Sequence, residues 1–99
     1  MKVVLTNRAR RRVLVVGRWW RNHRPDAADL FERELEEVIE KLTSGPTFGL
    51  VHGIVRGHTI RRMRLPTSEQ HVYYSVNPTT DTVVIHTLWG PRRGRTPKL

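Results

Sequence analysis

The 99-residue sequence has no cysteine, few aromatic residues and no long apolar run. Without cysteine the chain can form neither a disulfide nor a thiolate nucleophile, which is consistent with a reducing compartment. No stretch approaches the ~20 apolar residues that span a bilayer. The opening run Met1–Leu5 is also too short for the core of a signal peptide. We therefore expect one soluble, cytoplasmic domain over residues 1–99, large enough for a two-layer core.

Acidic residues are scarce outside one segment. The chain has 18 Lys+Arg and 9 Asp+Glu, a formal net charge of +9. Seven of the nine acidic residues lie within Asp26–Glu40, so the remaining surface is strongly cationic. A field polarised in this way favours polyanions, either nucleic acid or an acidic protein partner.

The strongest pattern that is present lies in the last third of the chain. Two runs rich in β-branched and aromatic residues, His71–Val76 and Thr82–Trp89, flank a turn-forming segment over residues 77–81, which predicts a β-hairpin. Tyr73, Val84 and Leu88 on the opposite faces indicate a hairpin central to its sheet. Alternation assigns one face of each strand as follows: Val72, Tyr74 and Val76 on the first, and Val83, Ile85, Thr87 and Trp89 on the second.

The first third predicts a strand at Lys2–Leu5, an N-cap at Thr6-Asn7 and then a helix. Apolar residues recur at helical spacing on one stripe: Ala9, Val13, Val16 and Trp20. Val15 and Trp19 lie to one side of this stripe. They can pack against a second helix, or they can form a groove for a partner's helix; both interpretations stay open.

The segment after Pro25 predicts a second helix capped by Asp26, with Asp29 completing an arrangement similar to a capping box. Its apolar stripe is Ala28, Phe31, Leu35, Val38 and Leu42. We interpret the acidic residues opposite as a solvated face rather than a metal site, because cation ligands must converge from several directions. Gly45 and Pro46 should end this helix.

The middle of the chain predicts a loop over Phe48–Gly57 and then a strand over His58–Leu65, bulged near Arg61-Arg62. Alternation gives this strand a largely cationic face with Arg62 and Arg64. The predicted class is α+β: an N-terminal strand, an antiparallel two-helix hairpin and a three-stranded antiparallel meander, with the helices on one sheet face.

Three runs together, Ile60–Arg64, Val72–Val76 and Val84–Gly94, resemble the RelE/ParE toxins of type II toxin–antitoxin modules. The resemblance extends over nearly the whole chain. It implies a bacterial or archaeal growth inhibitor, of the kind linked to plasmid stabilisation, that a cognate antitoxin neutralises by wrapping around it. We expect no cofactor, no metal and no membrane partner.

The RelE branch of this family implies a ribosome-dependent endoribonuclease that cuts mRNA by 2′-hydroxyl attack. Such a reaction requires cations to stabilise the phosphorane and an acid–base pair. By resemblance, Arg64 and either Arg92 or Arg93 match the family's arginines, whereas Trp89 stands where many relatives carry His. His71 is a further substitute for the acid–base group. The weak catalytic candidates are Arg61, Arg64, Tyr73, His86 and Arg92.

The ParE branch implies a protein that poisons DNA gyrase and needs no hydrolytic site. Because no Tyr or His follows Trp89, the sequence favours this branch. The expected target-binding residues are Arg62, Arg64, Arg92, Arg93, Arg95 and Lys98, and the expected antitoxin-binding residues are Val15, Trp19 and Trp89. A non-toxic basic nucleic-acid-binding domain is a further alternative. The toxin interpretation requires the arginines of the two segments to meet on one uncovered side.

Overall fold

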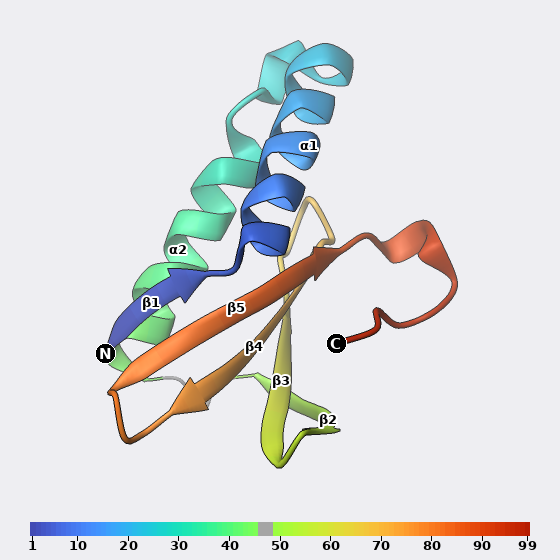
Figure 1. Ribbon diagram of the computed structural model, residues 1–99. Coiled ribbons are helices and arrows are strands. Elements are labelled where there is room, and N and C mark those ends of the chain that lie inside the picture. Colours follow the sequence, from blue (N-terminus) through green and yellow to red (C-terminus); the bar gives the residue numbers. More distant parts are fainter. Residues whose placement is uncertain (46–48) are drawn as a thin grey trace.

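A computed structural model describes residues 1–45 and 49–99. Figure 1 shows a strand followed by two helices and four further strands. Within the described residues no helix combines the length and the apolar character needed to cross a membrane. The elements are β1 (Lys2–Leu5), α1 (Asn7–His23), the 3₁₀ turn η1 (Pro25–Ala27), α2 (Leu30–Ser44), β2 (Leu50–Val55), β3 (His58–Arg64), β4 (His71–Asn77), β5 (Thr82–Trp89) and the 3₁₀ turn η2 (Pro91–Arg93).

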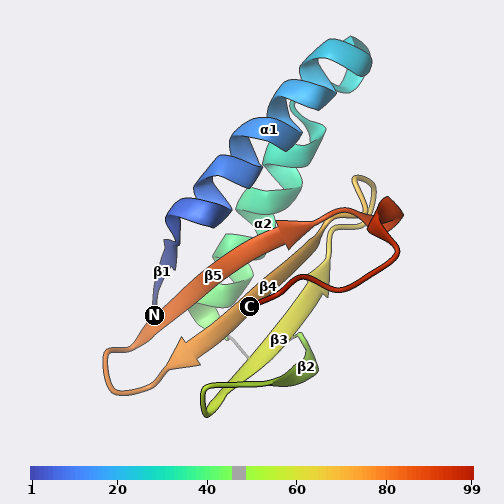
Figure 2. The same ribbon diagram turned by 45° about the vertical axis from the view of Figure 1, so that its right-hand side comes forward.

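The five strands form one sheet in the order β1-β5-β4-β3-β2. β1 runs parallel to β5, and the other neighbours are antiparallel. Figures 1 and 2 show both helices on one face of the sheet, while the C-terminal segment crosses the other. The α+β prediction is confirmed, and so is the central position of the β4–β5 hairpin. We call the sheet face away from the helices the open face.

The start of α1 is fixed by Thr6, as the sequence predicts. Its Oγ1 accepts a hydrogen bond from the amide of Ala9 at 3.0 Å, which satisfies one of the free N–H groups of the first turn. The same hydroxyl donates to the carbonyl of His86 at 2.8 Å. One residue therefore caps the helix and ties it to β5.

The main core lies between the helices and the sheet. Its buried side chains are Ala9, Val16, Trp20, Phe31, Leu35, Val38, Leu42, Leu65, Val72, Tyr74, Val83, Ile85 and Leu88. The predicted apolar stripes of both helices thus face this layer, as hydrophobic burial requires, except for Ala28, which precedes α2 and is not part of the core.

The predicted start of the second helix is wrong. Asp26 lies in the 3₁₀ turn η1, and α2 begins only at Leu30. Asp29 occupies the N-cap position but makes no side-chain capping bond; its carboxylate instead pairs with Arg33 at 3.2 Å. Pro25 explains the difference, because it favours a short turn before the α-helix can start. The helix ends at Ser44, and Pro46 lies outside the described residues.

The loop predicted over Phe48–Gly57 is also wrong over most of its length, because β2 occupies Leu50–Val55 and pairs with β3. Arg56 and Gly57 join the two strands with φ of 51° and 80°. Two successive positive φ angles are those of the tight turns that match strand twist. Glycine here is therefore a hairpin signal, not a sign of irregular chain.

Two bulges change which side chains share a face. The sequence predicts a bulge in β3 near Arg61-Arg62, but the extra residue lies in the partner strand β2. There the pairing with β3 shifts between Val51, which pairs with Arg61, and Gly53. In β5 the pairing shifts at His86, and alternation reverses beyond it. Leu88 consequently joins the core beneath the helices. The predicted grouping of Thr87 and Trp89 with Val83 and Ile85 is wrong for this reason.

Candidate functional site

The open face brings β3 and the end of β5 together, but the C-terminal segment crosses the same face, so it is not the uncovered side that the toxin interpretation requires. Arg64 pairs with His71, and His71 pairs with Trp89 across three adjacent strands. Since neighbouring strands lie about 4.8 Å apart, β3 and β5 are separated only by the width of two strand spacings. A second buried cluster, formed by Ile60, Tyr73 and Trp89, lies on this face.

The cations after β5 are arranged around Trp89. The Cζ atoms of Arg93 and Arg95 lie 4.3 Å and 5.6 Å from the centroid of its ring, a distance typical of cation–π contacts. The indole Nε1 donates to the carbonyl of Arg95 at 2.6 Å. The carbonyl of Lys98 accepts a hydrogen bond from Arg8 of α1. These contacts hold the C-terminal segment over the open face and leave Trp89 only 8% exposed.

Tyr73 lies beneath this surface and not on it. Its side chain is 1% exposed, and its ring packs edge to face against those of His52 and His71. Burial, followed by the charges of Arg62 and Arg64, lowers the pKa of His71. The two arginines of β3 therefore lie close to His71, on the same side of the sheet as Trp89.

Arg61 lies apart from the other catalytic candidates. It pairs with Tyr74, whose side chain belongs to the core beneath the helices, and its Nη1 donates to the carbonyl of Gly49 at 2.9 Å. Gly49 also donates its amide to the Tyr74 hydroxyl at 2.9 Å, and a Cβ at this position would lie 2.6 Å from that oxygen. Arg64 is on the open face and forms an ion pair with Glu69.

His86 lines a pocket of about 360 Å³, together with Ser75 and His58. Its Nε2 is 2.7 Å from the Oγ of Ser75. Burial, followed by the charge of His58, lowers the pKa of His86, so the imidazole is neutral at physiological pH. The described lining of this pocket does not contain Arg64 or Arg92.

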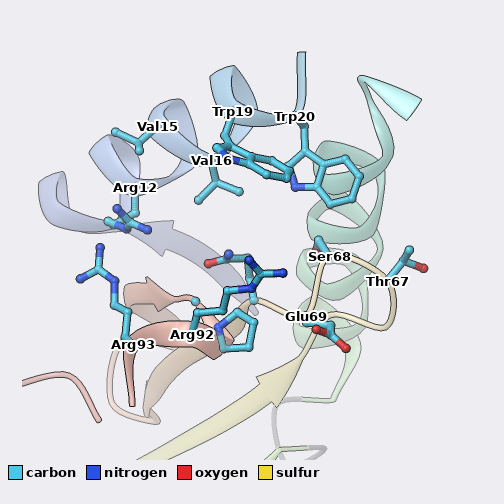
Figure 3. A pocket seen from close by; sticks show the side chains of 13 residues that line it. Arg12, Val15, Val16, Trp19, Trp20, Thr67, Ser68, Glu69, Arg92 and Arg93 are labelled. Atoms are coloured by element: carbon cyan, nitrogen blue, oxygen red, sulfur yellow. The ribbon is translucent and has the colours of Figure 1, made fainter. Parts of the chain in front are cut away.

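A second hollow of about 430 Å³ lies between α1, the β3–β4 loop and the residues after β5. We call it the α1 pocket. Figure 3 shows the guanidinium groups of Arg12, Arg92 and Arg93 around one space, with Trp19 and Trp20 on its helical side. Val15 and Trp19 both line it, whereas Trp89, the third predicted antitoxin-binding residue, is not part of its described lining.

Glu34 of α2 holds the β3–β4 loop, which forms one side of the α1 pocket. Its carboxylate accepts hydrogen bonds from the backbone amides of Thr67 and Ser68 at 2.8 Å and 2.9 Å. Burial raises the pKa of Glu34, but the hydrogen bonds from Ser68 and Thr67 outweigh burial and leave the pKa below its ordinary value. An ionised carboxylate thus fixes the β3–β4 loop.

Arg12 was not among the residues singled out by the sequence. Burial is the main cause that lowers the pKa of Arg12, and the positive charges of Arg93 and Arg8 lower it further. The only signal in the sequence was the position of Arg12 one helical turn before Val15 and Val16. Among the described residues no three His, Cys, Asp or Glu side chains lie close enough together to hold a metal ion.

Comparison with known proteins gives structural likenesses but no match in sequence. No protein-family model matches the chain, and no curated protein matches its sequence. Among solved structures, the chain is similar to a chain of the intact E. coli RelBE toxin–antitoxin complex, with a TM-score of 0.58 and 14% sequence identity. The match covers 93% of this chain and 98% of the other. The two chains therefore share a fold.

Proposed function

We propose that this protein is the toxin of a type II toxin–antitoxin module. Two independent likenesses support the proposal: the order of motifs in the sequence resembles the RelE/ParE toxins, and the fold matches a chain from a toxin–antitoxin complex over nearly its full length. The cationic surface adds an affinity for acidic partners, which a neutralising antitoxin would satisfy.

We further propose that the toxin is ParE-like and inhibits DNA gyrase by binding. One observation carries this choice: Trp89 and the C-terminal segment from Arg95 onward cover the part of the open face where an RNA-cleaving site would lie. An RNA-cleaving site needs an acid–base group that reaches the substrate, yet Tyr73 is buried and Trp89 stands where many relatives carry His. The accessible groups are guanidiniums at the rim: Arg92, Arg93 and Arg95.

A supercoiling assay with purified protein tests this function. Wild-type protein in stoichiometric excess should block supercoiling of relaxed plasmid by gyrase. A variant in which Arg92, Arg93 and Arg95 are replaced by Gln should lose most of the inhibition. A matched control removes the exposed charges of Arg11, Arg18 and Lys41 by the same change and should inhibit like wild type. Full gyrase activity at excess wild-type protein would reject the gyrase target.

A RelE-like, ribosome-dependent endoribonuclease is the second candidate, and the short Ser75–His86 contact favours it. A neutral imidazole with a hydroxyl at 2.7 Å can accept a proton, which is the role of a general base. Primer extension on translated mRNA would then show breaks that disappear in a His86→Gln variant. Intact mRNA during growth arrest would exclude this candidate.

A further inference from the structure

We propose that the α1 pocket is the docking site for a segment of a partner protein in which an acidic side chain adjoins a large apolar one. The proposal rests on the proposed function only in that the antitoxin would carry this segment. It names a site and a chemistry of recognition: a carboxylate held by Arg12, Arg92 and Arg93, and an apolar group held against α1.

The charge of the lining selects the anion. Three arginines from two distant parts of the chain line the pocket: the guanidiniums of Arg12 and Arg93 lie at one end of it, and that of Arg92 extends toward the β3–β4 loop (Figure 3). Glu69 is the one acidic residue in the described lining, and its carboxylate is already paired with Arg64. Planar guanidiniums bind carboxylates through paired hydrogen bonds, so an acidic side chain complements this arrangement.

Three buried polar atoms in the same described lining lack partners. The Nε of Arg12, the Oγ of Ser68 and the Oε1 of Gln70 are inaccessible to solvent and make no hydrogen bond. Buried polar groups in proteins are nearly always paired, and those that are not call for an explanation. Because these atoms are inaccessible from outside, a docked carboxylate would pair with the terminal nitrogens of Arg12 and not with its Nε.

The apolar wall indicates a protein segment and not a small anion. Val15 and Trp19 are 54% and 48% exposed, and Leu14 extends this apolar surface along α1 beyond the pocket. Exposed apolar surface of this kind, with charges at its edge, is typical of protein-binding sites. The pocket has room for one large side chain, and the apolar surface beside it accommodates the residues that follow.

The same rings do not suit a nucleic acid. Trp19 and Trp20 meet edge to face at 73°, so they present no common plane for stacked bases. Trp19 is moreover already stacked on His23, with the ring centroids 4.6 Å apart and an interplanar angle of 9°. These ring contacts therefore favour an acidic protein segment over a nucleic acid as the occupant of the α1 pocket.

Two synthetic peptides test the proposal on the full-length chain. The first is acetyl-Glu-Leu-Phe-Glu-amide, and its twin carries Gln in place of both Glu residues. Binding is followed by the indole N–H signals in NMR titrations. The acidic peptide should shift the signals of Trp19 and Trp20, and the twin should bind about tenfold more weakly because it makes no charge-assisted hydrogen bond.

Two variants locate the anion. Arg12→Gln should weaken the acidic peptide about tenfold and leave the twin unaffected. Arg18→Gln removes the same charge from an exposed position of α1 outside the described lining, and should change the affinity by less than about twofold. Trp19→Ser should weaken both peptides, because it removes apolar contact common to them.

Several results would overturn the proposal. Equal affinity of the two peptides, equal losses for Arg12→Gln and Arg18→Gln, or no shift of the two indoles at millimolar peptide would each do so. Tighter binding of a single-stranded oligonucleotide to the same residues would assign the pocket to nucleic acid instead. If the protein binds the acidic peptide but neither arrests growth nor affects gyrase, the docking site stands and the toxin function is rejected. If the protein is toxic but does not bind the peptide, the toxin function stands and the docking site is rejected.

Discussion

Arg12 of α1 and Arg93 of η2 bring two charges of the same sign to one end of the α1 pocket (Figure 3). Burial and this repulsion both lower the pKa of Arg12, which means that its charged form is less stable in the folded protein than in water. Arrangements that cost stability in this way cluster at functional sites.

Arg12→Gln should not destabilise the free protein. The substitution removes a partly buried charge that opposes Arg93 and Arg8, so thermal unfolding should occur at the wild-type temperature or a few degrees above it. Differential scanning calorimetry measures this directly. Arg18→Gln serves as the exposed control. A marked fall in the unfolding temperature of Arg12→Gln alone would show that Arg12 is a structural residue.

Glu34→Gln should destabilise the fold by about 1–3 kcal/mol. The neutral amide offers one oxygen and one NH₂ group to two backbone N–H donors, those of Thr67 and Ser68, so one donor loses its acceptor. Urea unfolding measures the change. Glu36→Gln, on the exposed side of the same helix, should have almost no effect. Equal stabilities for the two variants would contradict the role assigned to Glu34.

The stability of the protein should fall between about pH 7.5 and about pH 5.5, in part because of His86. Burial, followed by the charge of His58, lowers the pKa of His86 in the folded state, so the unfolded chain binds the proton more readily. The contribution of a neutral His86 is therefore complete above about pH 6.5 and is lost as the pH falls through the folded pKa. His71 shifts in the same direction.

A His86→Gln variant isolates this contribution. Its free energy of unfolding, measured in urea at both pH values, should depend less on pH than that of wild type. The remaining dependence reports His71, which the variant retains. Identical pH dependence in the two proteins would contradict the assignment to His86.

Trp89→Phe should loosen the C-terminal segment without unfolding the sheet. Phenylalanine keeps a ring beneath Arg93 but has no N–H for the carbonyl of Arg95. Limited trypsin digestion should therefore cleave after Arg95 faster than in wild type, while cleavage after Arg62 in β3 stays slow. Unchanged cleavage after Arg95 would mean that the indole does not hold this segment in place.

The architecture could be predicted because its signals are local. Thr6 caps a helix next to it, the stripe of α2 recurs every three or four residues, and the β4–β5 hairpin has a turn-forming sequence between two β-rich runs. Strand β2 was missed because Gly53 interrupts its apolar pattern and Gly49 and Gly57 flank it. A single extra residue at His86 then exchanged the faces of Leu88 and Trp89, and no local pattern announces such a bulge.

The candidate site could be predicted only in part. Alternation correctly placed Arg62 and Arg64 on one face of β3, and the open face brings them near Trp89. The α1 pocket joins Arg12, Gln70 and Arg93 from three distant segments. Their proximity depends on how α1 crosses the end of β5, which is a property of tertiary packing. Arg61 was misleading because it turns to the helical side, where the Gly49 carbonyl holds it.

Induced expression in a bacterial host tests the toxin function most directly. Growth and the topology of a reporter plasmid are followed with the chain expressed alone and together with the protein encoded by the neighbouring open reading frame. We predict growth arrest with loss of negative supercoiling when the chain is alone, and recovery of both when the neighbour is present. Normal growth and normal supercoiling at verified expression of the chain alone would contradict the account and leave a non-toxic basic binding domain.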